Sequence, residues 1–171
     1  CVSSETQILG KTIGMPLVLA PVGMAGMMSR RGETNGARAA HKLSIPFTLS
    51  TLGVCSVDEV NAASPNPCWF QLYMLKDRSA VESLLQKALD NGCDTLVFTV
   101  DLAVTGIRHR DTHSGMIGNN PTAMAFNKFK QLASRPTWLW DVAIKGKPHN
   151  IGNVSHLSLI HISEPTRRTP I

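Results

Sequence analysis

Several features that mark common classes of protein are absent from this 171-residue sequence. No apolar run approaches the roughly 20 residues that a membrane-spanning helix needs. The four cysteines show no C-x-x-C spacing, and no secretory signal is visible. These absences predict reduced thiols in a cytoplasmic compartment and argue against a membrane span or a disulfide framework.

The sequence also lacks any block of basic residues interleaved with aromatic ones. Its formal net charge is +5, from 17 Lys and Arg against 12 Asp and Glu, and the basic residues are spread along the chain. Binding of nucleic acid is therefore not expected. A modest positive bias suits an anionic ligand such as a phosphate or carboxylate, or an acidic membrane surface.

Short apolar runs that end in small or polar residues recur at similar intervals. They span residues 17–23, 47–51, 69–73 and 96–101. The stretches between them are typical of helices, so the pattern indicates βα units around a parallel sheet. Because a complete (β/α)8 TIM barrel needs about 250 residues, we predict an α/β fold that forms roughly the first half of such a barrel.

Helix signals fall between these runs. Residues 30–43 are good helix formers, and Ser56 with Glu59 forms a capping box for a short second helix. Ser79 with Glu82 predicts the start of a third helix. Its expected buried stripe follows helical spacing, with Gly92 at the end: Val81, Leu84, Leu85, Ala88 and Leu89.

The chain changes in character after the fourth run. Residues 104–155 are rich in polar residues, Gly and Pro, which predicts a long insertion after the fourth strand, partly helical between 122 and 134. Its Trp, Met and Lys residues would suit a membrane interface, whereas the simpler interpretation is a loop folded over its own barrel. We assign residues 1–155 to the barrel domain and expect 156–171 to be a non-native tail.

Side chains able to bind a ligand gather at the predicted strand ends. Chemistry in parallel α/β folds collects at the carboxyl ends of the strands. There, hydroxyl and amide groups suit a heteroaromatic ring rich in carbonyls and nitrogens, and a glycine lets the backbone approach it. The candidate ligands are Pro21, Val22, Gly23, Ser50, Gln71 and Thr99.

Two further residues are candidates for substrate binding. Tyr73 shares a strand face with Gln71, so it either reaches the same pocket or is a core tyrosine. Arg108 could hold a carboxylate through two hydrogen bonds, or lie in a solvated loop. An alternating set, His109, Asp111 and His113, has metal-ligand chemistry but lacks a fourth ligand, so no metal is assigned.

Together these motifs resemble the FMN-dependent α-hydroxy-acid dehydrogenases and oxidases, most of all the L-lactate dehydrogenase branch. The resemblance runs from about residue 13 to residue 155. It is carried by residues 20–23, 47–51, 69–73, 99–101 and 106–111, and by an insertion with 113–116 and 148–153.

The resemblance implies a TIM barrel that binds FMN. The backbone of residues 21–23 would contact the flavin, Ser50 and Gln71 would bond its ring or ribityl region, and Thr99 its pyrimidine edge. The implied reaction is oxidation of L-lactate, or a similar 2-hydroxy acid, to the 2-oxo acid by hydride transfer to FMN.

The resemblance also assigns roles on the substrate side. Tyr73 would hydrogen-bond the substrate and act in catalysis, and Arg108 would contact its carboxylate or help close the site. The family's base is a histidine in a His-Gly-Gly segment, which does not occur here. We therefore expect the chain to be an inactive fragment.

For the intact protein, the resemblance implies a quinone or cytochrome as electron acceptor and a homo-oligomer. It also implies a cytoplasmic protein peripheral to the inner face of the cell membrane. The alternatives are a soluble 2-hydroxy-acid oxidase that uses oxygen, a non-catalytic fragment, and a phosphate-binding or metal-binding barrel module.

Overall fold

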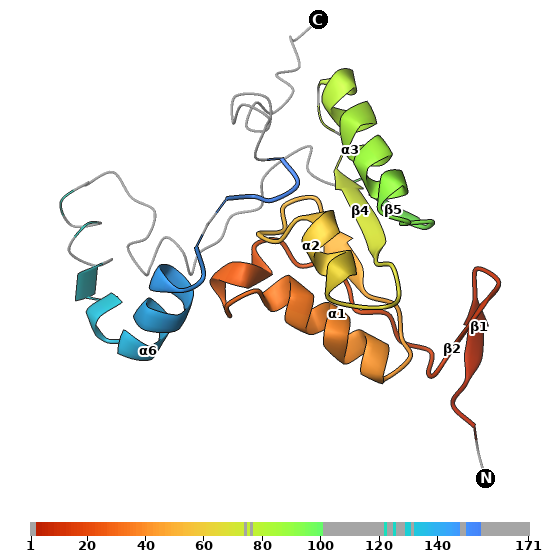
Figure 1. The fold of residues 1–171 in the computed structure, drawn as a ribbon, viewed down its shortest axis with the longest axis horizontal. Coiled ribbons are helices and arrows are strands. Elements are labelled where there is room, and N and C mark those ends of the chain that lie inside the picture. The colour runs from red at the N-terminus through yellow and green to blue at the C-terminus, as the bar shows by residue number, and fades with distance from the viewer. Residues whose placement is uncertain are drawn as a thin grey trace, which may run out of the picture.

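The computed structural model describes residues 3–73, 75, 77–100, 122, 125, 129–130, 132–147 and 150–154 (Figure 1). The elements in chain order are strands β1 (Thr6–Ile8) and β2 (Lys11–Ile13), 3-10 helix η1 (Ala25–Met27), helix α1 (Gly32–Lys42), strand β3 (Thr48–Ser50), helix α2 (Val57–Ala62), strand β4 (Trp69–Tyr73), helix α3 (Arg78–Asp90), strand β5 (Leu96–Thr99), helix α6 (Pro136–Trp138) and π-helix η2 (Leu139–Ile144).

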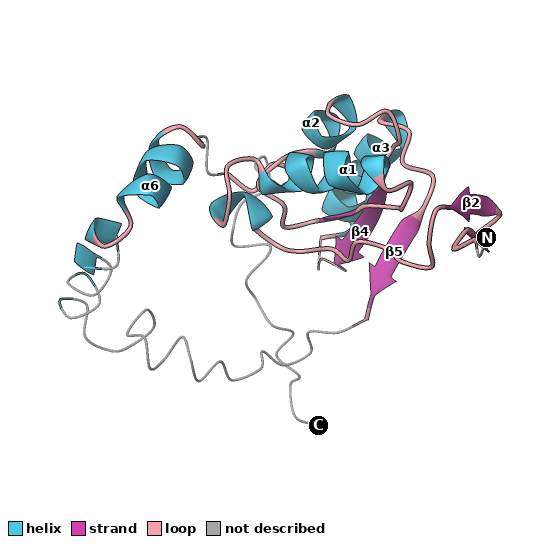
Figure 2. Cartoon of the chain, turned by 90° about the horizontal axis from the view of Figure 1, so that it is seen from below, coloured by secondary structure: helices cyan, strands magenta, loops and turns pink. Residues whose placement is uncertain are grey.

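The centre of the fold is a parallel sheet with strand order β3-β4-β5. A parallel bridge between Leu19 and Phe47 places the first predicted strand beside β3. Helices α1, α2 and α3 lie on one face of the sheet (Figure 2). The predicted α/β class with parallel strands is therefore confirmed, and the sheet formed by the described residues is open rather than a closed barrel.

The hydrophobic core lies between the sheet and these helices. Alternate strand residues Leu49, Phe70 and Leu72 are at most 2% exposed. They belong to one cluster with Val57, Val60, Ala80, Val81, Leu84 and Ala88 of the helices. Each large apolar side chain buried here stabilises the fold by about 1.5–3 kcal/mol. The opposite alternate residues, which include Ser50 and Gln71, face away from the helices.

The helix starts agree with the sequence in two of three cases. Helix α1 lies within the predicted segment, and Ser56 caps α2 by accepting the N–H of Glu59 at 3.4 Å. For α3 the predicted cap at Ser79 was wrong, because Asp77 accepts the N–H of Ser79 at 2.9 Å. A carboxylate is favoured at this position because it also meets the positive end of the helix dipole.

The predicted stripe of α3 needs one correction. Val81, Leu84 and Ala88 are buried, but Leu89 is 62% exposed. Each helical residue is rotated by about 100° from the one before, so Leu89 is turned past the edge of the stripe that contains Ala88. Gly92 follows the helix with φ of 80°, as its predicted position requires.

The antiparallel hairpin β1–β2 was not predicted from the sequence. Its turn is Leu9–Gly10, both with positive φ, where Asn-Gly or Asp-Gly would be the usual signal. The hairpin lies at the side of the molecule opposite α6 (Figure 1). An ion pair between Lys11 of β2 and Asp94 links the hairpin to the turn before β5.

The described part of the insertion packs against the start of the domain. Thr122, Ala125, Phe129, Lys130, Leu132 and Ala133 are helical, in agreement with the prediction for 122–134. The indole N–H of Trp138 donates to the carbonyl oxygen of Met27 at 2.9 Å, and Arg30 pairs with Asp141 at 3.4 Å. Of the helices described, none is long and apolar enough to cross a membrane. The predicted tail, 156–171, lies outside the described residues.

The cap of α3 provides a test of the helix start. We expect Asp77→Ala to lower the free energy of unfolding by about 1 kcal/mol, because the N–H groups of Ser79 and Ala80 both lose their acceptor. The matched control is Ser79→Ala, which removes a hydroxyl but keeps the cap and should cost less than about 0.5 kcal/mol. Urea denaturation measures both, and equal losses would favour the start at Ser79.

Candidate active site

A row of hydrogen-bonded polar side chains crosses the ends of the three strands. The hydroxyl of Ser50 donates to Oε1 of Gln71 at 3.0 Å. Nε2 of Gln71 donates to Oγ1 of Thr99 at 2.8 Å. One residue from each of β3, β4 and β5 therefore takes part, and the structure brings together the three side chains that sequence reasoning selected.

Gln71 is the centre of this row and is completely buried. Its Oε1 also accepts the backbone N–H of Thr51 at 3.3 Å. A primary amide is costly to bury unless its groups are bonded, so these partners fix its orientation. Thr99 is only partly buried, and it extends the row toward the open side of the sheet.

The segment Pro21, Val22 and Gly23 follows the short bridge at Leu19, which pairs with Phe47 just before β3. The N–H of Met24 donates to the carbonyl oxygen of Leu52 at 2.9 Å, and the N–H of Leu52 donates to the Ser50 hydroxyl at 3.2 Å. A Cβ added at Gly23 would meet nothing closer than Leu52, at 3.7 Å. Val22 and Gly23 are exposed, so their backbone can be approached by a ligand.

Tyr73 stands at the end of β4, opposite Thr99 in the strand register. Its backbone N–H donates to Oγ1 of Thr51 at 3.2 Å, and its side chain is half-buried. The strand period places it on the face of Gln71, as predicted. Arg108, the other predicted substrate ligand, lies outside the described residues.

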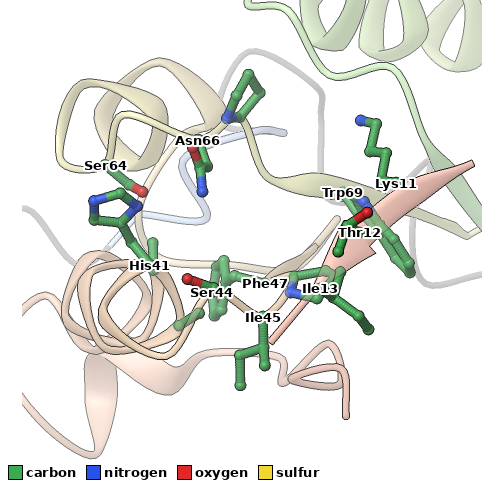
Figure 3. Close-up of a pocket in the computed structure, with 14 residues that line it drawn as sticks. Lys11, Thr12, Ile13, His41, Ser44, Ile45, Phe47, Ser64, Asn66 and Trp69 are labelled. Carbon is green, nitrogen blue, oxygen red and sulfur yellow. The ribbon is translucent and has the colours of Figure 1, made fainter. Parts of the chain in front are cut away.

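A cavity of about 380 Å³ lies at the other end of the strands (Figure 3). Among its lining residues are Ile13 of the hairpin, His41 near the end of α1, and Trp69 at the start of β4. Because this is the amino end of the sheet, the cavity is separate from the polar row.

Metal chemistry finds no support in the part of the chain that is described. These residues contain no group of three His, Cys, Asp or Glu side chains able to hold a metal ion. The alternating set His109, Asp111 and His113 lies outside them.

Comparison with known proteins decides the family. The match to the family described as FMN-dependent dehydrogenase covers residues 1–167. The chain belongs to this family. It is 51% identical over 164 residues to the L-lactate dehydrogenases of Yersinia pestis (strain Pestoides F) and Yersinia pseudotuberculosis serotype O:1b (strain IP 31758), which is 96% of this chain and 41% of each relative. The resemblance inferred from the motifs is confirmed.

Solved structures give the same assignment. A crystal structure of the monotopic membrane protein (S)-mandelate dehydrogenase is similar with a TM-score of 0.74 and 34% identity, over 88% of this chain and 39% of that one. A crystal structure of mandelate oxidase is similar with a TM-score of 0.63 and 37% identity, over 70% and 34%. The chain thus spans about two fifths of the curated relatives' length, 41%.

Sequence reasoning missed a buried carboxylate that joins two loops of this FMN-dependent dehydrogenase chain. Oε1 of Glu33, in the first turn of α1, accepts the N–H groups of Gly26 at 3.0 Å and Val54 at 2.9 Å. A Cβ at Gly26 would lie 2.7 Å from the Val54 side chain, so glycine is needed for this approach. The signal was present, because Glu33 shares a helical face with buried Ala37 and Ala40.

Glu33 also influences a neighbouring thiol. Burial, and after it the negative charge of Glu33, raises the pKa of Cys55 to about 12. The Cys55 side chain therefore stays a protonated thiol at neutral pH, with little nucleophilic character.

The segment after the insertion returns to the same strand end. Asn153 is 1% exposed, its Oδ1 accepts the N–H of Val57 at 2.9 Å, and its Nδ2 donates to the carbonyl oxygen of Ser50 at 3.3 Å. The N–H of Gly152 donates to the carbonyl oxygen of Gly53 at 2.9 Å. Asn153 thus holds both the end of β3 and the start of α2. The sequence could not assign this role, because 96 residues separate Asn153 from Val57.

Replacement of Asn153 tests this docking. We expect Asn153→Ala to lower the free energy of unfolding by about 1–3 kcal/mol, because the N–H of Val57 is left buried without its acceptor. Asn150→Ala, at an exposed position three residues earlier, is the control and should change it by less than about 0.5 kcal/mol. Similar values for the two variants would show that the segment does not dock on β3.

Proposed function

We propose that this chain is the first half of a TIM barrel in an FMN-dependent dehydrogenase that oxidises L-lactate, or a similar 2-hydroxy acid, to the 2-oxo acid. The observation that carries the proposal is the row Ser50–Gln71–Thr99 at the strand ends of a chain that belongs to this family. The similar proteins named as lactate and mandelate dehydrogenases support the choice of substrate class.

The half-barrel assignment is supported by a difference in the burial of apolar side chains on β4 and β5. Phe70 and Leu72 of β4 are buried under the helices, whereas the aligned Leu96 and Phe98 of β5 are each 48% exposed. Large apolar side chains on a parallel strand are normally covered by a crossover helix. A further βα unit would cover this face, as a barrel requires, with the insertion placed after β5.

The residues present fit FMN. An isoalloxazine ring needs hydroxyl and amide groups at its polar edge and a close, flat approach at one face. Ser50, Gln71 and Thr99 would supply the polar groups. The open space beside Gly23 would let the ring come close to the backbone of Pro21 and Val22. When bound, FMN supplies the two-electron acceptor for the hydride that leaves the α-carbon.

The side chains nearest the open end would act on the substrate. The hydroxyl of Tyr73 would donate a hydrogen bond to the substrate oxygen and so hold the α-carbon in position. Arg108 would bind the substrate carboxylate with two parallel N–H groups. The family's proton-accepting histidine lies in a His-Gly-Gly segment, and this sequence contains none. We therefore assign binding and positioning, not proton abstraction, to this chain.

We further propose peripheral contact with the inner face of the cell membrane and transfer of electrons to a quinone or cytochrome by a homo-oligomeric, cytoplasmic enzyme. Trp140 is 57% and Ile144 is 50% exposed in η2. The Lys145 ammonium lies 5.2 Å from the Trp140 ring centroid, and such a mixture suits a lipid headgroup region. A soluble oxidase that passes electrons to oxygen is the alternative. Rates of oxygen consumption and of quinone reduction, each measured with and without membranes, distinguish the dehydrogenase from the oxidase.

Substitutions in the complete enzyme test the two halves of the assignment. We expect Tyr73→Phe to retain FMN and to lower lactate turnover by about 10-fold or more, because one hydrogen bond to the reacting substrate is lost. The matched change Gln71→Leu should instead lower the flavin content. The absorbance of bound flavin measures the flavin content, and steady-state rates measure turnover. Loss of flavin in Tyr73→Phe would show that Tyr73 contacts the cofactor instead of the substrate.

The chain by itself tests where the base resides. We expect residues 1–171 with excess FMN to show no lactate-dependent dye reduction, because general-base catalysis needs a group within hydrogen-bond reach of the substrate hydroxyl. The control is the complete enzyme under the same conditions. Turnover that His109→Ala or His113→Ala abolishes would place the base in this chain and contradict the assignment.

A further inference from the structure

The structure brings two cysteines into contact at the end of the sheet opposite the polar row. Sγ of Cys68 and Sγ of Cys93 are 3.6 Å apart, although 25 residues separate them in the chain. Cys68 directly precedes β4, and Cys93 lies in the turn between α3 and β5. The two side chains are 2% and 5% exposed and belong to the hydrophobic core.

A single side chain holds the two cysteines in this arrangement. Oδ1 of Asn61 in α2 accepts the backbone N–H of Cys68 at 2.9 Å. Its Nδ2 donates to the carbonyl oxygen of Asn91 at 2.8 Å and to Sγ of Cys93 at 3.5 Å. The amide therefore fixes the segment before β4 to the turn before β5, and it leaves an N–H group on one sulfur.

The two sulfurs differ in chemistry. The hydrogen bond from Cys68, and the amide of Asn61, lower the pKa of the Cys93 thiol, whereas the same Cys68–Cys93 bond and burial raise the pKa of Cys68. Because the amide N–H of Asn61 lies on Sγ of Cys93, where it stabilises a thiolate, we assign Cys93 as the nucleophile of the pair and Cys68 as the resolving thiol. The neighbours Gly92 and Asp94 are exposed, so a small oxidant has only a short distance to travel to Cys93.

We infer that Cys68 and Cys93 form a dithiol site that hydrogen peroxide oxidises to a disulfide. The Cys93 thiolate attacks the peroxide, an S–O bond forms as the O–O bond breaks, and the departing hydroxide takes up a proton to leave as water. The Cys68 sulfur then attacks the sulfenic sulfur, the S–S bond forms, and the oxygen leaves with the remaining protons as a second water. Two thiols lose two electrons, and one peroxide becomes two waters.

The separation suits this product. Disulfide sulfurs lie about 2.05 Å apart, so closing the bond from 3.6 Å needs the two sulfur atoms to approach by roughly 1.5 Å. The bond would join the start of β4 to the start of β5, with no part in the Ser50–Gln71–Thr99 row. It would therefore be a modification site separate from the flavin site.

The test uses the 171-residue chain with Cys1 replaced, Cys1→Ser, so that three cysteines remain. Hydrogen peroxide should remove about 2 Da from the intact mass, and a non-reducing digest should show the 68–93 linkage. Cys55→Ser, the matched control, should keep this product, whereas Cys68→Ser and Cys93→Ser should lose it. The native chain should form it at least about tenfold faster than the chain in urea, because the fold holds the thiols together.

Dimedone, which traps sulfenic acids, tests the order of the two steps. Cys68→Ser should accumulate the adduct at Cys93, and Cys93→Ser should give at least about tenfold less adduct at Cys68. Two results would overturn the inference: the same mixture of linkages in buffer and in urea, or loss of about 2 Da in the Cys93→Ser variant. Equal trapping at both cysteines would overturn the assignment of Cys93 as nucleophile.

Discussion

The buried amide of Gln71 is the contact on which the candidate site depends. It bonds a hydroxyl on each neighbouring strand, so the ends of β3, β4 and β5 are held in one register by side chains as well as by the backbone ladder. A buried amide with unpaired groups would cost free energy, so Ser50 and Thr99 are needed by the fold itself. Under the proposed function, the same groups would meet the polar edge of the flavin ring, and folding and ligand binding would share one set of hydrogen bonds.

Two other buried polar side chains stabilise the loops around this row. Glu33 joins η1, at Gly26, to the loop after β3, at Val54. Asn153 joins the segment after the insertion to Ser50 at the end of β3. Both side chains accept backbone N–H groups, so each fixes a loop, and Val22 and Gly23 remain exposed beside them. A rigid second layer under an accessible first layer is what a preorganised binding site requires.

Local patterns predicted the elements, and contacts distant in sequence account for what was missed. The apolar runs and the Ser56 box gave β3, β4, β5 and α2, because strand period and capping act within a few residues. The gathering of Ser50, Gln71 and Thr99 was expected, since parallel strand ends must meet at one edge of a sheet, whereas their hydrogen bonds to one another were not predicted. The helical face of Glu33 indicated its burial, but its bond to Val54 and the role of Asn153 could not be derived in this way, because these partners lie 21 and 96 residues away. The cap of α3 failed for a local reason, since Asp77 and Ser79 are both good caps and only one can begin the helix.

The two ends of the sheet have different chemistry, and this division explains where each kind of residue occurs. At the carboxyl ends, Ser50 and Gln71 are buried and bonded to one another, and Thr99 and Tyr73 are the polar side chains of the row and its border that stay partly accessible. At the amino ends, the hairpin is held by Lys11 and Asp94, and Asn61 ties the start of β4 to the turn before β5. Parallel βα folds generally keep stability at the amino ends and chemistry at the carboxyl ends. A covalent bond between Cys68 and Cys93 would therefore act on the stabilising end, and it could strengthen the sheet while the geometry of the row stays unchanged.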